Sequence, residues 1–214
     1  MKPIIFVRIA DMKYYKGITE NDVPDNGGSY VKENKEAHEC YNFDSVTFED
    51  DKEYCLGFTM LTGGRTDKEI QLHIDKIVGC QLARKEAAVD DVIVVWVSKA
   101  RNSQNMRVVG FYKNAKVYRM PQYAEFDSGY IQQYNFISEK KNCVLLPYIE
   151  RHGNSKWYVP SSQKNHSTFG FGRANVWYAG TDTNDEKELE YVDRMIASIE
   201  GYRGENWIDK GGAQ

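Results

Sequence analysis

Hydrophobic positions along this chain fall into short extended runs separated by polar turns. The longest continuous apolar run covers residues 92–97, and a polar connector joins it to a second run over 107–112. A run without polar interruptions is typical of a strand that is buried on both faces. Gly110 stands in the second run where a side chain would crowd a neighbour. The pattern predicts a small closed sheet built around these two strands.

Other runs of the same kind predict further strands. They occupy residues 3–9, 55–61, 70–78, 134–138, 142–146, 157–159 and 175–179. In the run over 70–78, apolar residues alternate with polar ones from Ile70 to Asp75, so His73 is expected to point away from the apolar face. Residues 12–29 form a long loop rich in Tyr, Asp, Asn and Gly, and long loops in compact domains are often functional.

One helix is predicted over residues 185–202. Its apolar residues recur at helical spacing: Leu189, Val192, Met195, Ile196 and Ile199. Thr183 and Glu186 have the spacing of a capping box, and Gly201 or Gly204 is expected to end the helix. The fold class that follows is α+β, with this amphipathic helix packed on the sheet.

The chain is expected to form one main domain. Its 214 residues, 41% of them hydrophobic, suffice for a packed core. We expect residues 1–180 to make the sheet domain, 181–204 the helix packed on it, and 205–214 a tail or linker.

The charge balance limits the possible partners. Lys and Arg number 28 against 31 for Asp and Glu, a net charge of −3, so any contact with nucleic acid must be local. The first apolar run is too short for a signal peptide, and no apolar span approaches membrane length. The four cysteines lack the close spacing of a zinc site. We therefore expect a cytoplasmic protein with no cofactor, no metal and no membrane partner.

Glycines alternate with aromatic rings in residues 167–178, which also contain Arg173 and Asn175. Glycine lets the backbone approach a ligand closely, rings stack on bases, and an asparagine amide can pair with a base edge. This combination suits a flat polar ligand. A turn with packed aromatic side chains is the alternative.

The central hairpin carries six cations and no acidic residue within 21 residues: Lys99, Arg101, Arg107, Lys113, Lys116 and Arg119. A one-sided cluster on a net acidic chain is typical of an edge that binds phosphates, and a solvated face is the alternative.

Known catalytic patterns do not fit the sequence. His38 beside Glu39 lacks the second histidine and the ligands of an HNH-type nuclease centre, and surface charge explains Glu69, Asp75 and Lys76 better than a PD-(D/E)xK centre does. No serine lies in a GxSxG motif. We assign no catalytic residue.

Residues 90–119 resemble the PUA-like superfamily, which includes EVE, YTH, ASCH and SRA-type domains. The likeness rests on Asp90 and Asp91 entering the apolar strand, then the connector, then 108–112 running into 115–119. The stretches GGSYVKEN, HECYNF and GFGRANVWYA are similar to amino-terminal domains attached to modification-dependent restriction nucleases. The resemblance covers roughly residues 1–180.

This resemblance implies a PUA-like small β-barrel with flanking helices that reads a modified base, flipped out of its duplex, in an aromatic pocket. It implies a role in restriction-modification defence, with modified DNA favoured over RNA and with a fused or partner nuclease. The base pocket is expected at Tyr30, Asn34, Asn42, Trp96, Phe169, Phe171, Asn175 and Trp177. The nucleic-acid backbone is expected at Lys99, Arg101, Arg107, Lys113, Lys116, Arg119 and Arg173. Two alternatives stay open: a complete modification-dependent endonuclease, and a module that binds a peptide.

Overall fold

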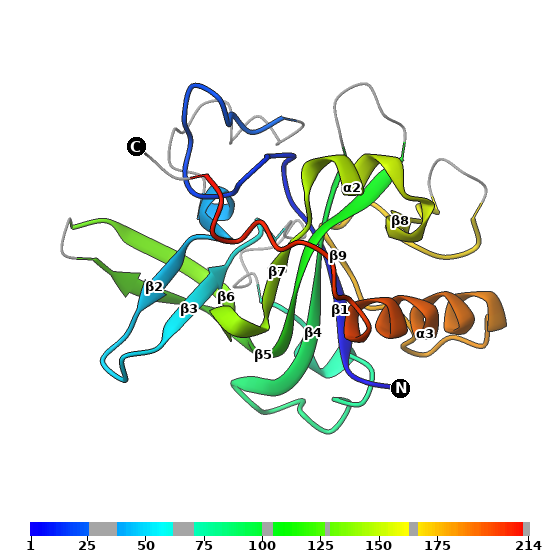
Figure 1. Ribbon diagram of the computed structural model, residues 1–214. Helices are drawn as coiled ribbons and strands as arrows, with labels where there is room; N and C mark the ends of the chain where they lie inside the picture. Colours follow the sequence, from blue (N-terminus) through cyan, green and yellow to red (C-terminus); the bar gives the residue numbers. More distant parts are fainter. Residues whose placement is uncertain (26–37, 62–70, 100–104, 127–128, 163–166, 212–214) are drawn as a thin grey trace.

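A computed structural model shows a strongly curved sheet with a long helix on its outer face (Figure 1). The structure describes residues 1–25, 38–61, 71–99, 105–126, 129–162 and 167–211. Within these residues nine strands form one mixed sheet, whose main path runs β2-β3-β6-β5-β4-β1-β9, while β7 and β8 pair with β5. The predicted α+β class is confirmed. Among the described residues, the strands at the two ends of this path, β2 and β9, do not pair with each other, so the strands do not close into a barrel.

The strands are β1 (Ile4–Arg8), β2 (Ser45–Thr47), β3 (Glu53–Gly57), β4 (Ala88–Lys99), β5 (Met106–Glu125), β6 (Ile131–Glu139), β7 (Cys143–Leu145), β8 (Tyr158–Val159) and β9 (Val176–Trp177). The described helices are α2 (Tyr148–Gly153) and α3 (Glu186–Glu200), with short 3-10 turns η1 (His38–Tyr41), η2 (Ile74–Lys76), η3 (Lys140–Asn142) and η4 (Ser155–Trp157).

The predicted central pair is the antiparallel pair of β4 and β5, and β1 runs parallel to β4 on its other side. β5 is 20 residues long and pairs with β4, β6, β7 and β8 in turn. Its register with β6 shifts between Val117 and Gln122, as expected where a strand bends. β5 is therefore the strand around which the sheet curves.

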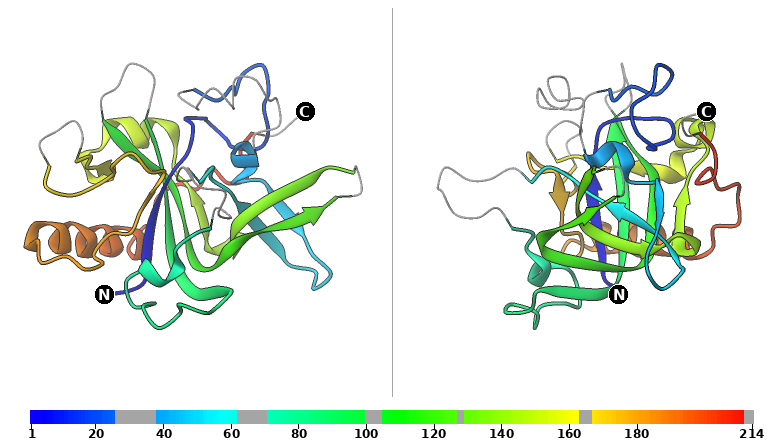
Figure 2. Two further views of the ribbon diagram at one scale, coloured as in Figure 1. Left: turned by 180° about the vertical axis from the view of Figure 1, so that it is seen from behind. Right: turned by 90° about the vertical axis from the view of Figure 1, so that its left-hand side faces the viewer.

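Two cores lie on opposite faces of β1 and β4. Val94 and Trp96 of β4 point into the inner core, within the curve of the sheet, while Val95 and Val97 point into the outer core under α3. Figure 2 shows α3 and the β2–β3–β6 strands on opposite sides of the central strands. Since both faces of β4 are covered, neither face of the run over 92–97 meets water, which explains why the run contains no polar residue.

α3 spans Glu186–Glu200, close to the predicted helix, but its cap differs from the prediction. The side chain of Asp185 accepts a hydrogen bond from the amide of Lys187 at 3.0 Å, so Asp185 is the N-cap. Thr183 stands before the cap, and its hydroxyl accepts from the amide of Asp185 at 3.1 Å. The predicted capping box of Thr183 and Glu186 is therefore wrong, because a residue nearer the helix takes the cap.

The described part of the expected tail is bound to the sheet. Asn206 donates to the carbonyl of Cys143 at 2.9 Å and accepts from the amide of Leu145 at 3.0 Å, and Ile208 is buried. Residues 205–211 thus lie along β7 as part of the domain.

The predicted strand over 70–78 is not formed. Residue 70 lies outside the described residues, and residues 74–76 make the turn η2. Leu72 and Ile74 are buried while Gln71 and His73 are exposed, so at these positions the alternation predicts burial correctly. Leu72 and Ile74 are buried by a tight turn and not by a strand. Periodicity over so few residues does not distinguish the two.

Candidate functional site

The described residues of the predicted base pocket do not line one cavity. Tyr30 and Asn34 lie outside the described residues. Trp96 is 0% exposed in the inner core, where its ring meets Tyr112 and Phe136 edge to face, each with 5.2 Å between ring centroids. Trp177 belongs to the outer core on the other face of the sheet. Trp96 and Trp177 therefore cannot stack on the same base.

The two described asparagines of the predicted pocket are occupied by protein partners. Asn42 donates to the carbonyl of Phe58 at 3.0 Å and accepts from its amide at 2.9 Å. Asn175 accepts from Nε of Arg8 at 3.1 Å and donates to the carbonyl of Met60 at 2.8 Å. Reading a base edge with either side chain would break these bonds, so they are structural links.

Phe169, Phe171 and Trp177 form a packed ring cluster beneath α3. The ring of Trp177 has its centroid 6.2 Å from that of Phe169 and 6.0 Å from that of Phe171, and 5.9 Å from that of Tyr191 on α3. For these three rings the alternative of a turn with packed aromatics describes the geometry better than a base pocket does.

The predicted backbone-binding cations do not form one patch. Arg101 lies outside the described residues, and Lys99 and Arg107 lie at the end of the β4–β5 pair where β4 ends and β5 begins. Arg119 is tied down by the carboxylate of Asp75 at 3.1 Å and the carbonyl of Ala83 at 2.8 Å. Its role is to hold the segment before β4. The Arg173 side chain is exposed next to the β1–β9 pair.

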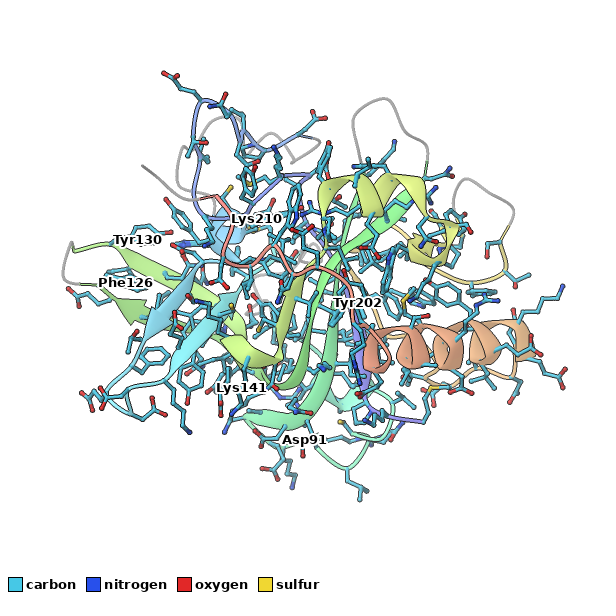
Figure 3. All side chains as sticks on the ribbon, viewed as in Figure 1. Asp91, Phe126, Tyr130, Lys141, Tyr202 and Lys210 are labelled. Atoms are coloured by element: carbon cyan, nitrogen blue, oxygen red, sulfur yellow. The ribbon has the colours of Figure 1, made fainter. Side chains whose placement is uncertain are left out.

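Lys113 and Lys116 lie near the other end of the β4–β5 pair. Lys116 lines a groove of about 840 Å³ together with Asp91 and Lys141, the latter two labelled in Figure 3. Glu49, Asp50 and Glu139 also line this groove, so lysines and carboxylates are mixed there. Mixed charge does not favour a phosphate backbone.

A group of buried polar residues lies at the carboxyl ends of β1 and β4, and of its members the sequence analysis proposed only Asn42 as a binding residue. Because these strands are parallel, both ends meet at the same edge of the sheet. The group consists of Asp11 and of six residues that bond to residues 8–14 or to Phe58: Asp22, Glu39, Asn42, Thr59, Ser98 and Arg151. Buried polar networks of this kind hold side chains in fixed positions.

At the centre of this group is the Asp11 site, which we define as Asp11, Ser98, Tyr148 and Arg151. The hydroxyl of Ser98 donates to the carboxylate of Asp11 at 2.5 Å, and the hydroxyl of Tyr148 lies 3.5 Å from its other oxygen. Asp11 is 5% exposed and Tyr148 is 37% exposed, so the carboxylate lies behind a ring at the surface. A carboxylate has about four acceptor positions, so these two hydroxyls leave capacity for a ligand.

Arg151 lies fully buried behind the site. Its guanidinium donates to the carbonyls of Leu146 at 2.8 Å, Met12 at 2.7 Å and Lys13 at 2.8 Å. Burial lowers the pKa of Arg151, and the charges of neighbours such as Asp11 oppose that shift. An arginine remains charged in proteins, so a buried cation lies near the Asp11 carboxylate.

Two aromatic side chains of α2, Tyr148 and His152, lie next to each other near Asp11. The rings of Tyr148 and His152 meet edge to face with 4.6 Å between centroids. Burial lowers the pKa of His152 from its ordinary 6.5, so its ring is mostly neutral at pH 7. Burial, followed by the charge of Asp11, raises the pKa of Tyr148, whose hydroxyl remains a donor.

The backbone of Asp25 pairs with that of Asp11 at this edge. Asp11 and Asp25 exchange two backbone hydrogen bonds, of 2.8 and 2.9 Å. Asp25 directly precedes residues 26–37, which contain Tyr30 and Asn34, and Lys99 directly precedes residues 100–104.

No family model, curated protein or solved structure matches this chain. Within the described residues, no group of three His, Cys, Asp or Glu side chains is placed to hold a metal ion. None of the described helices has the length and apolar character needed to cross a membrane.

Proposed function

We propose that this protein binds nucleic acid and reads a modified base at the Asp11 site, without cleaving its ligand. The observation that carries this proposal is a buried carboxylate with spare acceptor capacity behind an exposed tyrosine ring. A carboxylate accepts hydrogen bonds from the exocyclic amino group of a base such as cytosine. An extruded base would stack on Tyr148 and present its amino edge to Asp11.

The charges near the site agree with local contact to a phosphate backbone. Lys99 and Arg107 lie at the same end of the β4–β5 pair, where Ser98 is opposite Arg107. Two cations contribute a modest electrostatic attraction, which fits a chain with a net charge of −3. Stacking, worth roughly 1–3 kcal/mol per base, would then supply much of the affinity.

We also propose that the curved sheet corresponds to a PUA-like barrel. Residues 90–119, which carry the resemblance, form the greater part of the central β4–β5 pair. The chain after β3 is linked to β1 by the hydroxyl of Thr59, which donates to the carbonyl of Arg8 at 2.8 Å, and to the residue before β9 by the amide of Asn175. These side-chain bonds bring the two sides of the curved sheet together without a strand ladder.

Binding measurements with modified and unmodified nucleic acids test the proposal. Duplexes containing methylated, hydroxymethylated or unmodified cytosine, or methylated adenine, are titrated by fluorescence anisotropy, with RNA of the same sequence beside them. We expect one modified DNA duplex to bind at least about tenfold more tightly than the unmodified one. Equal binding to all, or none, would overturn the proposal.

The same duplexes incubated with Mg²⁺ or Mn²⁺ separate a reader from a nuclease. We expect them to stay intact. Cleavage that depends on the modification would instead support the complete endonuclease, and binding of none of the nucleic acids would leave the peptide-binding module as the surviving alternative.

A further inference from the structure

A second concave surface lies between the β8 region and α3, which are neighbours on the outer side of the sheet (Figure 1). This α3 cleft has a volume of about 560 Å³, and its walls include Lys156, Tyr158, Phe169, Tyr191 and Arg194. Sites for small molecules commonly measure roughly 300–1,000 Å³. The cleft contains none of the four residues that define the Asp11 site.

The charge of the α3 cleft is one-sided. Lys156 and Arg194 are exposed cations on its walls, and none of the described lining residues is acidic. Arg107 lies beside it, with its guanidinium 5.1 Å from the ring centroid of Tyr158. Among the ion pairs of the described residues, none involves these three side chains. Their positive charge is therefore available to an anion.

Each of the two lining cations rests on a ring. The ammonium of Lys156 lies 4.7 Å from the ring centroid of Trp157, and the guanidinium of Arg194 lies 5.9 Å from that of Tyr191. Cation–π contacts hold such side chains near a surface without cancelling their charge. The cations are thus positioned before a ligand arrives.

The walls between the cations are aromatic and fixed. Phe169 and Tyr191 have ring centroids 5.8 Å apart, and the hydroxyl of Tyr191 donates to the carbonyl of Tyr158 at 3.0 Å. That bond ties α3 to β8 at the base of the cleft. Phe169 is partly exposed, so one face of the ring cluster borders the cleft.

Phosphate groups pair with lysine and arginine, and nucleobases stack on aromatic side chains. We infer that the α3 cleft is a second binding site, which takes one nucleotide by its phosphate and its base. The nucleotide is either free or one unit of a strand, since both present the same phosphate and ring. This site goes beyond the proposed function, because neither Asp11 nor Tyr148 takes part in it.

Isothermal titration of the full chain at low salt tests the inference with four probes: adenosine monophosphate, adenosine, inorganic phosphate and a short single-stranded oligonucleotide. The variant combines Lys156→Gln with Arg194→Gln. Its matched control is Lys187→Gln, which removes an exposed cation from α3 outside the cleft. All these side chains are exposed, and circular dichroism checks that the variants fold.

We expect adenosine monophosphate or the oligonucleotide to bind at least about tenfold more tightly than adenosine and phosphate do, because cation and ring act together. The double variant should lose at least about tenfold in affinity, and Lys187→Gln should stay within about twofold. Absence of binding by both nucleotide-bearing probes would overturn the inference. So would binding that the double variant leaves unchanged.

The probes also identify the source of the nucleotide. If the ligand is a strand, the oligonucleotide binds more tightly than the monophosphate, and the double variant reduces its salt slope by about 0.7 for each phosphate that is no longer neutralised. If the ligand is free, the monophosphate binds at least as well. Asp11→Asn should leave binding of the monophosphate unchanged, so a failure of the base-reading proposal is distinguishable from a failure of this one.

Discussion

Asp22 and Arg151 bind the same turn of the chain: Asp22 binds its amides, and Arg151 binds its carbonyls. The carboxylate of Asp22 accepts from the amides of Lys13 at 2.6 Å and Tyr14 at 2.7 Å, while Arg151 donates to the carbonyls of Met12 and Lys13. The two buried charges act on each other through the peptide groups between them. Asp11 directly precedes this turn, so its position depends on a buried pair rather than on surface contacts.

We expect Arg151→Lys to destabilise the fold. A single ammonium cannot reach all three carbonyls that the guanidinium now binds, and each buried carbonyl left without a partner costs about 1–3 kcal/mol. The free energy of unfolding in urea should fall by about 2–5 kcal/mol. Arg173→Lys, at an exposed side chain, should change it by less than about 0.5 kcal/mol. Equal stability of the two variants would contradict the bridging role of Arg151.

Asp11→Asn is expected to weaken binding to the preferred modified duplex. The amide replaces one acceptor by a donor, which would face the donor of the base, and such a contact is worth about 1–3 kcal/mol. Anisotropy titrations should therefore show a loss of about tenfold or more. Asp193→Asn, an exposed carboxylate on α3, provides the control for the change in net charge. If both variants bind equally well, Asp11 does not read the base.

Gly110→Ala is expected to destabilise the sheet where β5 meets β7. A Cβ atom there would lie 2.4 Å from the carbonyl oxygen of Val144 and 2.5 Å from the ring of Phe43, which confirms the crowding that the sequence predicts. Overpacking of this kind costs about 1–3 kcal/mol. Gly172→Ala is the control, because its Cβ would meet nothing within 4 Å. Urea denaturation of both variants checks this, and matching midpoints would refute it.

Glu39 should make stability depend on pH. Burial raises its pKa above the ordinary 4.5, and the amide of Ala10, which donates to it at 3.0 Å, lowers the pKa in part. Since the folded-state pKa is the higher one, the folded protein binds more protons, and this contribution to stability falls as the pH rises from the ordinary pKa through the raised one.

The variant Glu39→Gln keeps the acceptor for Ala10 and removes the titration. Its midpoint of thermal unfolding should therefore decline less than that of the wild type across this pH range. Glu20→Gln, at an exposed position, serves as control and should follow the wild-type profile. A Glu39→Gln profile parallel to the wild type would show that Glu39 contributes no such dependence.

Local patterns in the amino-acid sequence were enough to predict two of the main elements, β4 and α3. Burial on both faces requires the continuous apolar run that became the core of β4, and a helix that covers one face requires the spacing found in α3. These two features depend on neighbours within a few residues, so the pattern contains them. At Gly110 the pattern predicts crowding, but the crowding groups, Val144 and Phe43, are distant in sequence.

The partners of polar and aromatic side chains, by contrast, follow from how the elements pack in space. Ser98 bonds Asp11 across 87 residues of chain, and Arg151 bonds Met12 across 139. Nothing local distinguishes these residues from surface ones, and nothing local marks Asn42 as buried. The apolar run predicts that Trp96 is buried, but it does not identify Tyr112 and Phe136 as the rings that contact it. A hydrogen bond or a ring contact depends on distance in space, and that distance is set when β1, β4 and α2 pack together.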